Sequence, residues 1–94
     1  MIKDQELLMK LLSDLFPKAK IYIYGSRARL THKIESDIDI AIDDSRKIPI
    51  LEMARARNVI EALNIPQMVD LVDLNSVGED FKNVILKEGV LWKS

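Results

Sequence analysis

Apolar residues recur along the chain with two different periods, and these periods predict the order of its helices and strands. Four leucines follow the i, i+3, i+4, i+7 spacing of a single helix face, so we expect a helix from about Lys3 to Phe16, ended by Pro17. A similar spacing predicts a second helix that begins near Pro49 and ends before Pro66. The four leucines are Leu8, Leu11, Leu12 and Leu15.

Three short runs outside these helices carry the β-branched and aromatic residues that are typical of strands. The first, Ile21 to Tyr24, ends at Gly25, where the backbone must turn or approach another group closely. The second, from Asp37 to Ile42, alternates acidic or small residues with isoleucines, and a third extends from Met68 to Leu74.

The C-terminal part of the chain predicts one more helix. Ser76 followed by Glu79 is a capping-box pattern, and the helix should run to about Lys87 and stop at Gly89. The ending Val90-Leu91-Trp92 is expected to form a short strand or to fold back on the core. This order of elements predicts an α/β (α+β) fold, a small mixed sheet flanked by helices, with carboxylates gathered on whichever face the helices leave open.

Composition limits the classes of protein that the chain can belong to. Its 94 residues predict one domain, residues 1–94, and the 14 basic and 15 acidic residues argue against a broad surface for nucleic acid or an anionic membrane. No apolar run approaches the roughly 20 residues that span a bilayer, so we expect a cytoplasmic protein. With no cysteine and one histidine, a bound metal must be held by oxygen, which favours magnesium or manganese.

Asp37 and Asp39 are the first candidates for such a site. In an extended strand, residues i and i+2 point to the same face, so the two carboxylates lie side by side. Like charges at this range repel by about 1 kcal/mol in water and about 4 kcal/mol at an effective dielectric constant of about 20. The pair therefore predicts a bound cation, although an acidic strand face can also be simply solvated, and Gly25-Ser26 alone is typical of an ordinary turn.

Three blocks of sequence, taken together, point to one family of proteins. They read Gly25-Ser26-Arg27-Ala28-Arg29, then Ser36-Asp37-Ile38-Asp39-Ile40-Ala41, then Val69-Asp70-Leu71-Val72-Asp73-Leu74. In this order they resemble the nucleotidyltransferase superfamily that includes DNA polymerase beta, and within it the short minimal nucleotidyltransferases, or MNT proteins. The catalytic fold of that family accounts for nearly the whole chain.

The resemblance implies transfer of a nucleoside monophosphate from a triphosphate, with ATP as the expected donor, to an acceptor hydroxyl. Asp37, Asp39 and Asp70 would ligate two Mg²⁺ ions, with Mn²⁺ as the alternative, to assist the departing pyrophosphate and to lower the pKa of the acceptor hydroxyl. Asp70 would also orient or deprotonate the acceptor. Asp73 is the alternative third carboxylate, because residues three apart in a regular strand point to opposite faces.

The first block would hold the phosphates. Gly25 lets the backbone approach them without a side chain in the way, and Ser26 can donate its hydroxyl and backbone N–H to a phosphate oxygen. Arg27 and Arg29 are either phosphate clamps or solvated loop charges. Three aromatic residues are interpreted as packing residues rather than as platforms for a base. They are Tyr22, Tyr24 and Trp92.

The chain contains no second module that would bind an acceptor, so we expect the acceptor to arrive on another protein. The family resemblance implies a HEPN-domain toxin, which an MNT antitoxin silences by transferring AMP to a tyrosine, by forming a complex, or by both. Alternative functions are a non-catalytic antitoxin, a nucleotidyltransferase for small molecules, and a nucleic-acid-extending module, the last disfavoured by the near-neutral charge. Apolar helix faces could also serve a homo-oligomer or hetero-oligomer.

Overall fold

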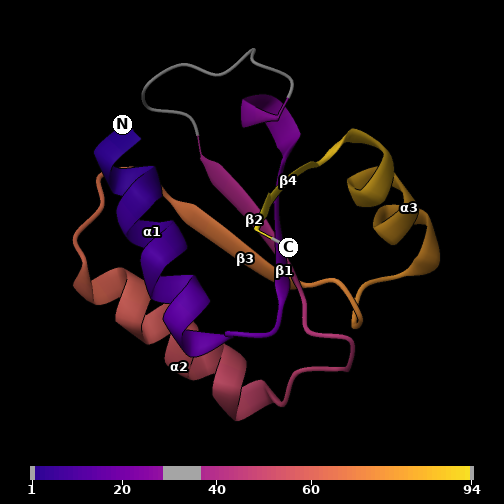
Figure 1. The fold of residues 1–94 in the computed structure, drawn as a ribbon, viewed down its shortest axis with the longest axis horizontal. Helices are drawn as coiled ribbons and strands as arrows, with labels where there is room; N and C mark the ends of the chain where they lie inside the picture. The colour runs from indigo at the N-terminus through magenta and orange to yellow at the C-terminus, as the bar shows by residue number, and fades with distance from the viewer. Residues whose placement is uncertain (1, 29–36, 94) are drawn as a thin grey trace.

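In the computed structural model, which describes residues 2–28 and 37–93, three α-helices surround a four-stranded sheet (Figure 1). The elements in chain order are α1 (Ile2–Leu15), β1 (Lys20–Tyr24), the short 3₁₀ helix η1 (Gly25–Arg27), β2 (Ile38–Asp43), α2 (Ile50–Ala62), β3 (Val69–Asp73), α3 (Glu79–Glu88) and β4 (Val90–Lys93). The predicted α+β fold is confirmed. No helix in these ranges is both long enough and apolar enough to cross a membrane.

The sheet is mixed, with the strand order β3-β2-β1-β4. Strand β1 pairs antiparallel with both β2 and β4, whereas β2 and β3 run parallel. In this register Tyr24 lies opposite Asp39, and Asp39 lies opposite Asp70. Because residues that lie directly opposite each other share a face of the sheet, these three side chains form one row across three strands.

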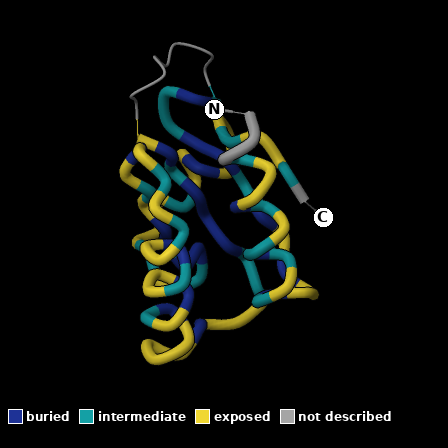
Figure 2. The backbone as a smooth tube through the Cα atoms, turned by 90° about the vertical axis from the view of Figure 1, so that its left-hand side faces the viewer, coloured by how far each residue is buried: buried dark blue, intermediate teal, exposed yellow. Residues whose placement is uncertain are grey.

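Helices cover both faces of the sheet. Isoleucines of β1 and β2 pack against α1 and α2 on one face, and Ile85 of α3 packs with Ala41 and Leu74 on the other. Buried residues therefore follow the strands through the middle of the molecule, and exposed residues lie on the outer turns of the helices (Figure 2). The prediction that the carboxylates lie on a face left open was wrong, because α3 packs on the face that carries Asp39 and Asp70. On that face Asp70 is exposed and Asp39 is half-buried.

The predicted capping box is also wrong. Helix α3 begins at Glu79 with Gly78 as its N-cap residue, and no side chain caps it. The hydroxyl of Ser76 instead donates a hydrogen bond of 2.6 Å to Oδ2 of Asp73. Because the helix starts three residues after Ser76, Ser76 belongs to the turn after β3 and its hydroxyl donates to the Asp73 carboxylate, a charge-assisted hydrogen bond.

Asp73 is a structural residue at the end of β3. Its side chain is only 6% exposed, and its carboxylate accepts hydrogen bonds from the backbone N–H groups of Ile48 at 2.7 Å and Asn75 at 3.0 Å, as well as from Ser76. These bonds fasten the loop before α2 and the turn after β3 to the sheet. The alternative in which Asp73 replaces Asp70 at the active site does not fit this arrangement.

Asp73→Ala is expected to lower the free energy of unfolding by about 3 kcal/mol, because it leaves buried donors without an acceptor. Urea denaturation followed by circular dichroism measures this. Asp70→Ala is the comparison on the same strand. Because Asp70 is exposed and accepts a longer hydrogen bond, of 3.3 Å from the Tyr24 hydroxyl, its loss should be smaller, about 1 kcal/mol. Equal losses for the two variants would contradict the structural assignment of Asp73.

Candidate active site

At the candidate site, the backbone of Gly25 lies close to the carboxylate of Asp39. Gly25 has a φ of 74°, a conformation that glycine adopts without strain, and a Cβ atom at this position would collide with Oδ2 of Asp39. The end of β1 thus presents bare backbone to a carboxylate on β2. The prediction that the chain turns at Gly25 and approaches another group closely is confirmed.

Arg27 joins this turn to the start of β2. Its side chain is only 6% exposed, and its Nε donates a hydrogen bond of 3.2 Å to the backbone carbonyl of Asp37. The interpretation of Arg27 as a solvated loop charge is therefore wrong, because the guanidinium lies inside the fold. Ser26 lies within η1, which packs against β2, and Arg29 falls outside the described residues. The phosphate-binding roles of these residues stay predictions.

Asp70 is held by a residue of β1. The hydroxyl of Tyr24 donates to Oδ2 of Asp70 at 3.3 Å, and the Tyr24 ring meets the ring of Phe81 edge-on, with centroids 5.7 Å apart. Burial raises the pKa of the Tyr24 hydroxyl well above its usual value, and the negative charges of Asp70 and Asp39 raise it further. Tyr24 therefore stays protonated and acts as a hydrogen-bond donor.

The three predicted metal ligands gather at one end of the sheet without converging on a point. Asp39 and Asp70 are neighbours in the parallel pair, and the exposed Asp37 directly precedes β2. Among the described residues, no three acidic or histidine side chains are arranged closely enough to hold a metal ion. Carboxylate oxygens are nonetheless the ligands that Mg²⁺ and Mn²⁺ prefer, so the set fits such an ion chemically, and metal binding stays a prediction.

Asp43 lies on the same strand but at the opposite end. Its Oδ1 accepts hydrogen bonds from the backbone N–H of Ser45 at 3.0 Å and from the side-chain amide of Asn75 at 2.9 Å. Partial burial acts to raise the pKa of Asp43, but these two bonds and the nearby charges of Lys82 and Lys20 outweigh it and lower the pKa. Asp43 therefore stabilises the turn after β2.

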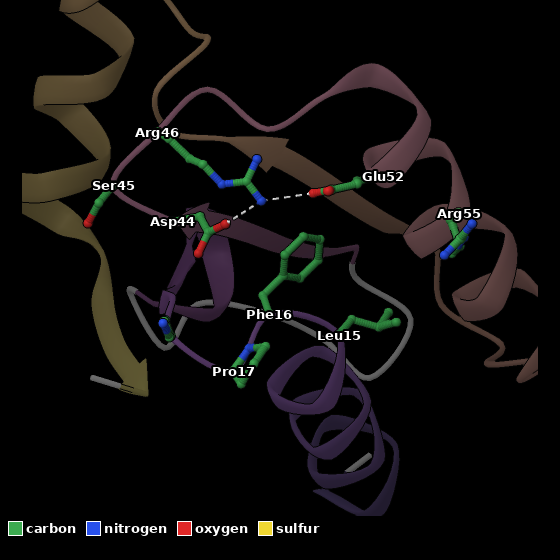
Figure 3. A pocket seen from close by; sticks show the side chains of 9 residues that line it. Leu15, Phe16, Pro17, Asp44, Ser45, Arg46, Glu52 and Arg55 are labelled. Atoms are coloured by element: carbon green, nitrogen blue, oxygen red, sulfur yellow. Dashed lines mark hydrogen bonds and ion pairs between the residues drawn. The ribbon is translucent and has the colours of Figure 1, made fainter.

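A pocket of about 530 Å³ also lies at that opposite end, between the end of α1, the loop after β2 and the start of α2 (Figure 3). Arg46 bridges it by ion pairs of 3.0 Å to Asp44 and to Glu52. Because the pocket contains none of the predicted site residues, it is separate from the candidate site.

Sequence reasoning missed two features of this site. Tyr24 was interpreted as a packing residue, and its ring does pack, but its hydroxyl reaches a predicted metal ligand. Arg27 was interpreted either as a phosphate clamp or as a solvated loop charge, and the structure shows that it is buried. The one available signal for Tyr24 is that it directly precedes Gly25-Ser26 at the end of a strand.

Comparison with known proteins identifies the family of the chain. Residues 6–94 match the family model described as polymerase beta, nucleotidyltransferase. The chain therefore belongs to the polymerase beta nucleotidyltransferase family and is a nucleotidyltransferase. The resemblance to minimal nucleotidyltransferases that the three sequence blocks predict is confirmed by the relatives described next.

One such relative is the Haemophilus influenzae protein named as a probable protein adenylyltransferase, MntA, which is 32% identical over 88 residues, 92% of this chain and 77% of that protein. A chain in the crystal structure of a toxin–antitoxin with AMP-PNP is 30% identical, with a TM-score of 0.76, and the match covers 97% of this chain and 73% of that one. A third match is to the complex of a tri-AMPylated Shewanella oneidensis HEPN toxin with an MNT antitoxin, at 28% identity and a TM-score of 0.72, covering 97% of this chain and 71% of that one.

Proposed function

We propose that this protein is the antitoxin of a HEPN/MNT pair, and that it transfers AMP from ATP to a tyrosine hydroxyl of the HEPN toxin. Support comes from the relatives named as a protein adenylyltransferase and as an MNT antitoxin in complex with an AMPylated HEPN toxin. The structural observation that carries the proposal is the contact between Gly25 and the Asp39 carboxylate, beside the row that contains Asp70. In the proposed reaction, phosphates would approach at Gly25, next to the oxygen ligands of Asp39 and Asp70.

The reaction forms one P–O bond, breaks another, and moves one proton from the acceptor. The acceptor oxygen attacks the α-phosphorus of ATP, the bond from that phosphorus to the bridging oxygen of the β-phosphate breaks, and pyrophosphate leaves with the bonding electrons. Asp37, Asp39 and Asp70 would hold two Mg²⁺ ions, which neutralise the triphosphate and make the acceptor hydroxyl more acidic. The exposed carboxylate of Asp70 would take the acceptor proton.

The residues that follow β1 would bind the phosphates of ATP. The missing side chain at Gly25 leaves room for the Asp39 carboxylate beside the turn, and the bare backbone there would let a phosphate approach. Ser26 would donate to a phosphate oxygen, and Arg29 would clamp the phosphates. Arg27 would act from inside the fold, because its bond to the Asp37 carbonyl sets where the acidic strand begins.

Incubation with ATP labelled at the α-phosphate tests the proposal. We expect the HEPN partner to gain label in the presence of Mg²⁺, and peptide mapping to place AMP on a tyrosine. Equal reactions that contain RNA or an aminoglycoside in place of the partner should gain none. Label on RNA or on the small molecule would favour those acceptors instead, and a partner that binds tightly but gains no label would indicate a non-catalytic antitoxin.

A further inference from the structure

One feature of the site has no assigned part in the reaction, the hydrogen bond between Tyr24 and Asp70. The two residues lie on strands that are not neighbours, since β2 separates β1 from β3. Adjacent strands are about 4.8 Å apart, so the two backbones are roughly 10 Å apart. The Tyr24 side chain therefore extends across β2 to reach Oδ2 of Asp70 at 3.3 Å.

The Tyr24 ring is fixed in this direction by packing. The residue is 9% exposed and belongs to a small core with Ala41, Leu74 and Ile85, and the edge-on ring of Phe81 supports it from α3. A buried ring has one accessible orientation, so its hydroxyl is held in place at little further entropic cost. By contrast Asp70 is exposed, and its carboxylate would otherwise rotate freely.

Tyr24 and Gly25 also hold Asp39 between them. Tyr24 lies opposite Asp39 in the antiparallel pair, and the next residue, Gly25, brings its backbone against the Asp39 carboxylate. Two consecutive residues at the end of β1 thus set the positions of carboxylates on two other strands. A small shift of reacting groups can cost about 100-fold in rate, so this positioning matters for chemistry.

We propose that Tyr24 is a positioning residue for the transfer reaction, and that its hydroxyl orients the carboxylate of Asp70 toward the metal ions and the acceptor. The inference rests on the proposed function for the reaction that it serves. Because the Tyr24 side chain is buried and its hydroxyl donates to Asp70, its effect would act through Asp70.

Tyr24→Phe tests this because it removes the hydroxyl and keeps the ring against Phe81. We expect kcat for AMP transfer to the HEPN partner to fall about tenfold or more, with the KM for ATP within about twofold. Titration with Mn²⁺ alone, followed by electron paramagnetic resonance, should show several-fold weaker binding, since Asp70 is less well oriented. The melting temperature of the metal-free variant should not fall by more than about 3 °C.

Tyr22→Phe is the matched control, because Tyr22 lies two residues earlier on the same strand and face and packs in the same core. It should leave kcat and Mn²⁺ affinity unchanged. If Tyr24→Phe matches Tyr22→Phe in both measurements, Tyr24 only packs and the inference is overturned. If the wild-type protein transfers no AMP, the proposed function fails, and Mn²⁺ affinity alone decides the role of Tyr24.

Discussion

Asp39→Asn is expected to lower the rate of AMP transfer by about 1000-fold or more. The substitution keeps the size of the side chain but removes the charge of the central carboxylate, which lies opposite Asp70 and against the Gly25 backbone. Loss of a ligand to a catalytic metal removes several kcal/mol of transition-state stabilisation, and each 1.4 kcal/mol is about tenfold in rate. Label transfer from ATP to the HEPN partner under single-turnover conditions measures the effect.

The same variant should remain folded. Asp39 and Asp70 are like charges side by side, so removing one relieves repulsion, and we expect the free energy of unfolding of the metal-free variant to stay within about 1 kcal/mol of the wild type. Asp43→Asn is the matched control, since Asp43 lies on the same strand and face at the far end. It should keep most of the activity. Transfer by Asp39→Asn at the normal rate would refute the mechanism.

Gly25→Ala is expected to damage both activity and stability. The φ of 74° is unfavourable for alanine, and the new methyl group would collide with the Asp39 carboxylate. Strain of this kind costs about 1–3 kcal/mol, and displacement of Asp39 should lower the transfer rate by about 100-fold. Thermal unfolding and label transfer on the same preparation measure the two effects.

Gly78→Ala provides the comparison. Gly78 has a φ of −63°, and a Cβ atom there would meet nothing within 4 Å, so the substitution adds the same methyl group in open space. Activity should be unchanged. Because Gly78 is the N-cap residue of α3, where alanine is less favourable than glycine, the free energy of unfolding should change by less than about 1 kcal/mol. If both glycine variants keep full activity, close approach at Gly25 is not required for transfer.

Most of the secondary structure could be predicted from local patterns. Helix α1 (Ile2–Leu15) and strand β2 (Ile38–Asp43) differ from the predicted boundaries by about one residue, because leucine spacing and alternating isoleucines report directly which face is buried. The start of α3 was predicted incorrectly, since the helix begins at Glu79 and Ser76 lies in the turn before it. The local sequence shows a capping-box pattern, but it does not show that Ser76 would bind the buried Asp73 carboxylate.

Some residues of the candidate site could likewise be predicted from local sequence, and others could not. The Asp37 and Asp39 pair and the turn at Gly25 are evident in a short stretch of chain, because strand parity and the backbone freedom of glycine are local properties. Strand parity alone shows that at most one of Asp70 and Asp73 can face the site, but it does not show which. Burial then separated them, since Asp73 is bonded inside the fold and Asp70 is exposed.

The sequence by itself thus determined which residue types lie on each strand, the family to which they point, and the oxygen-only character of any metal site. Only the tertiary structure decided that Tyr24, Asp39 and Asp70 form one row, that Arg27 is buried, and that α3 packs on the carboxylate face. The physical reason is that strand register and helix placement depend on contacts between segments far apart in the chain, whereas propensity and periodicity act over a few neighbouring residues.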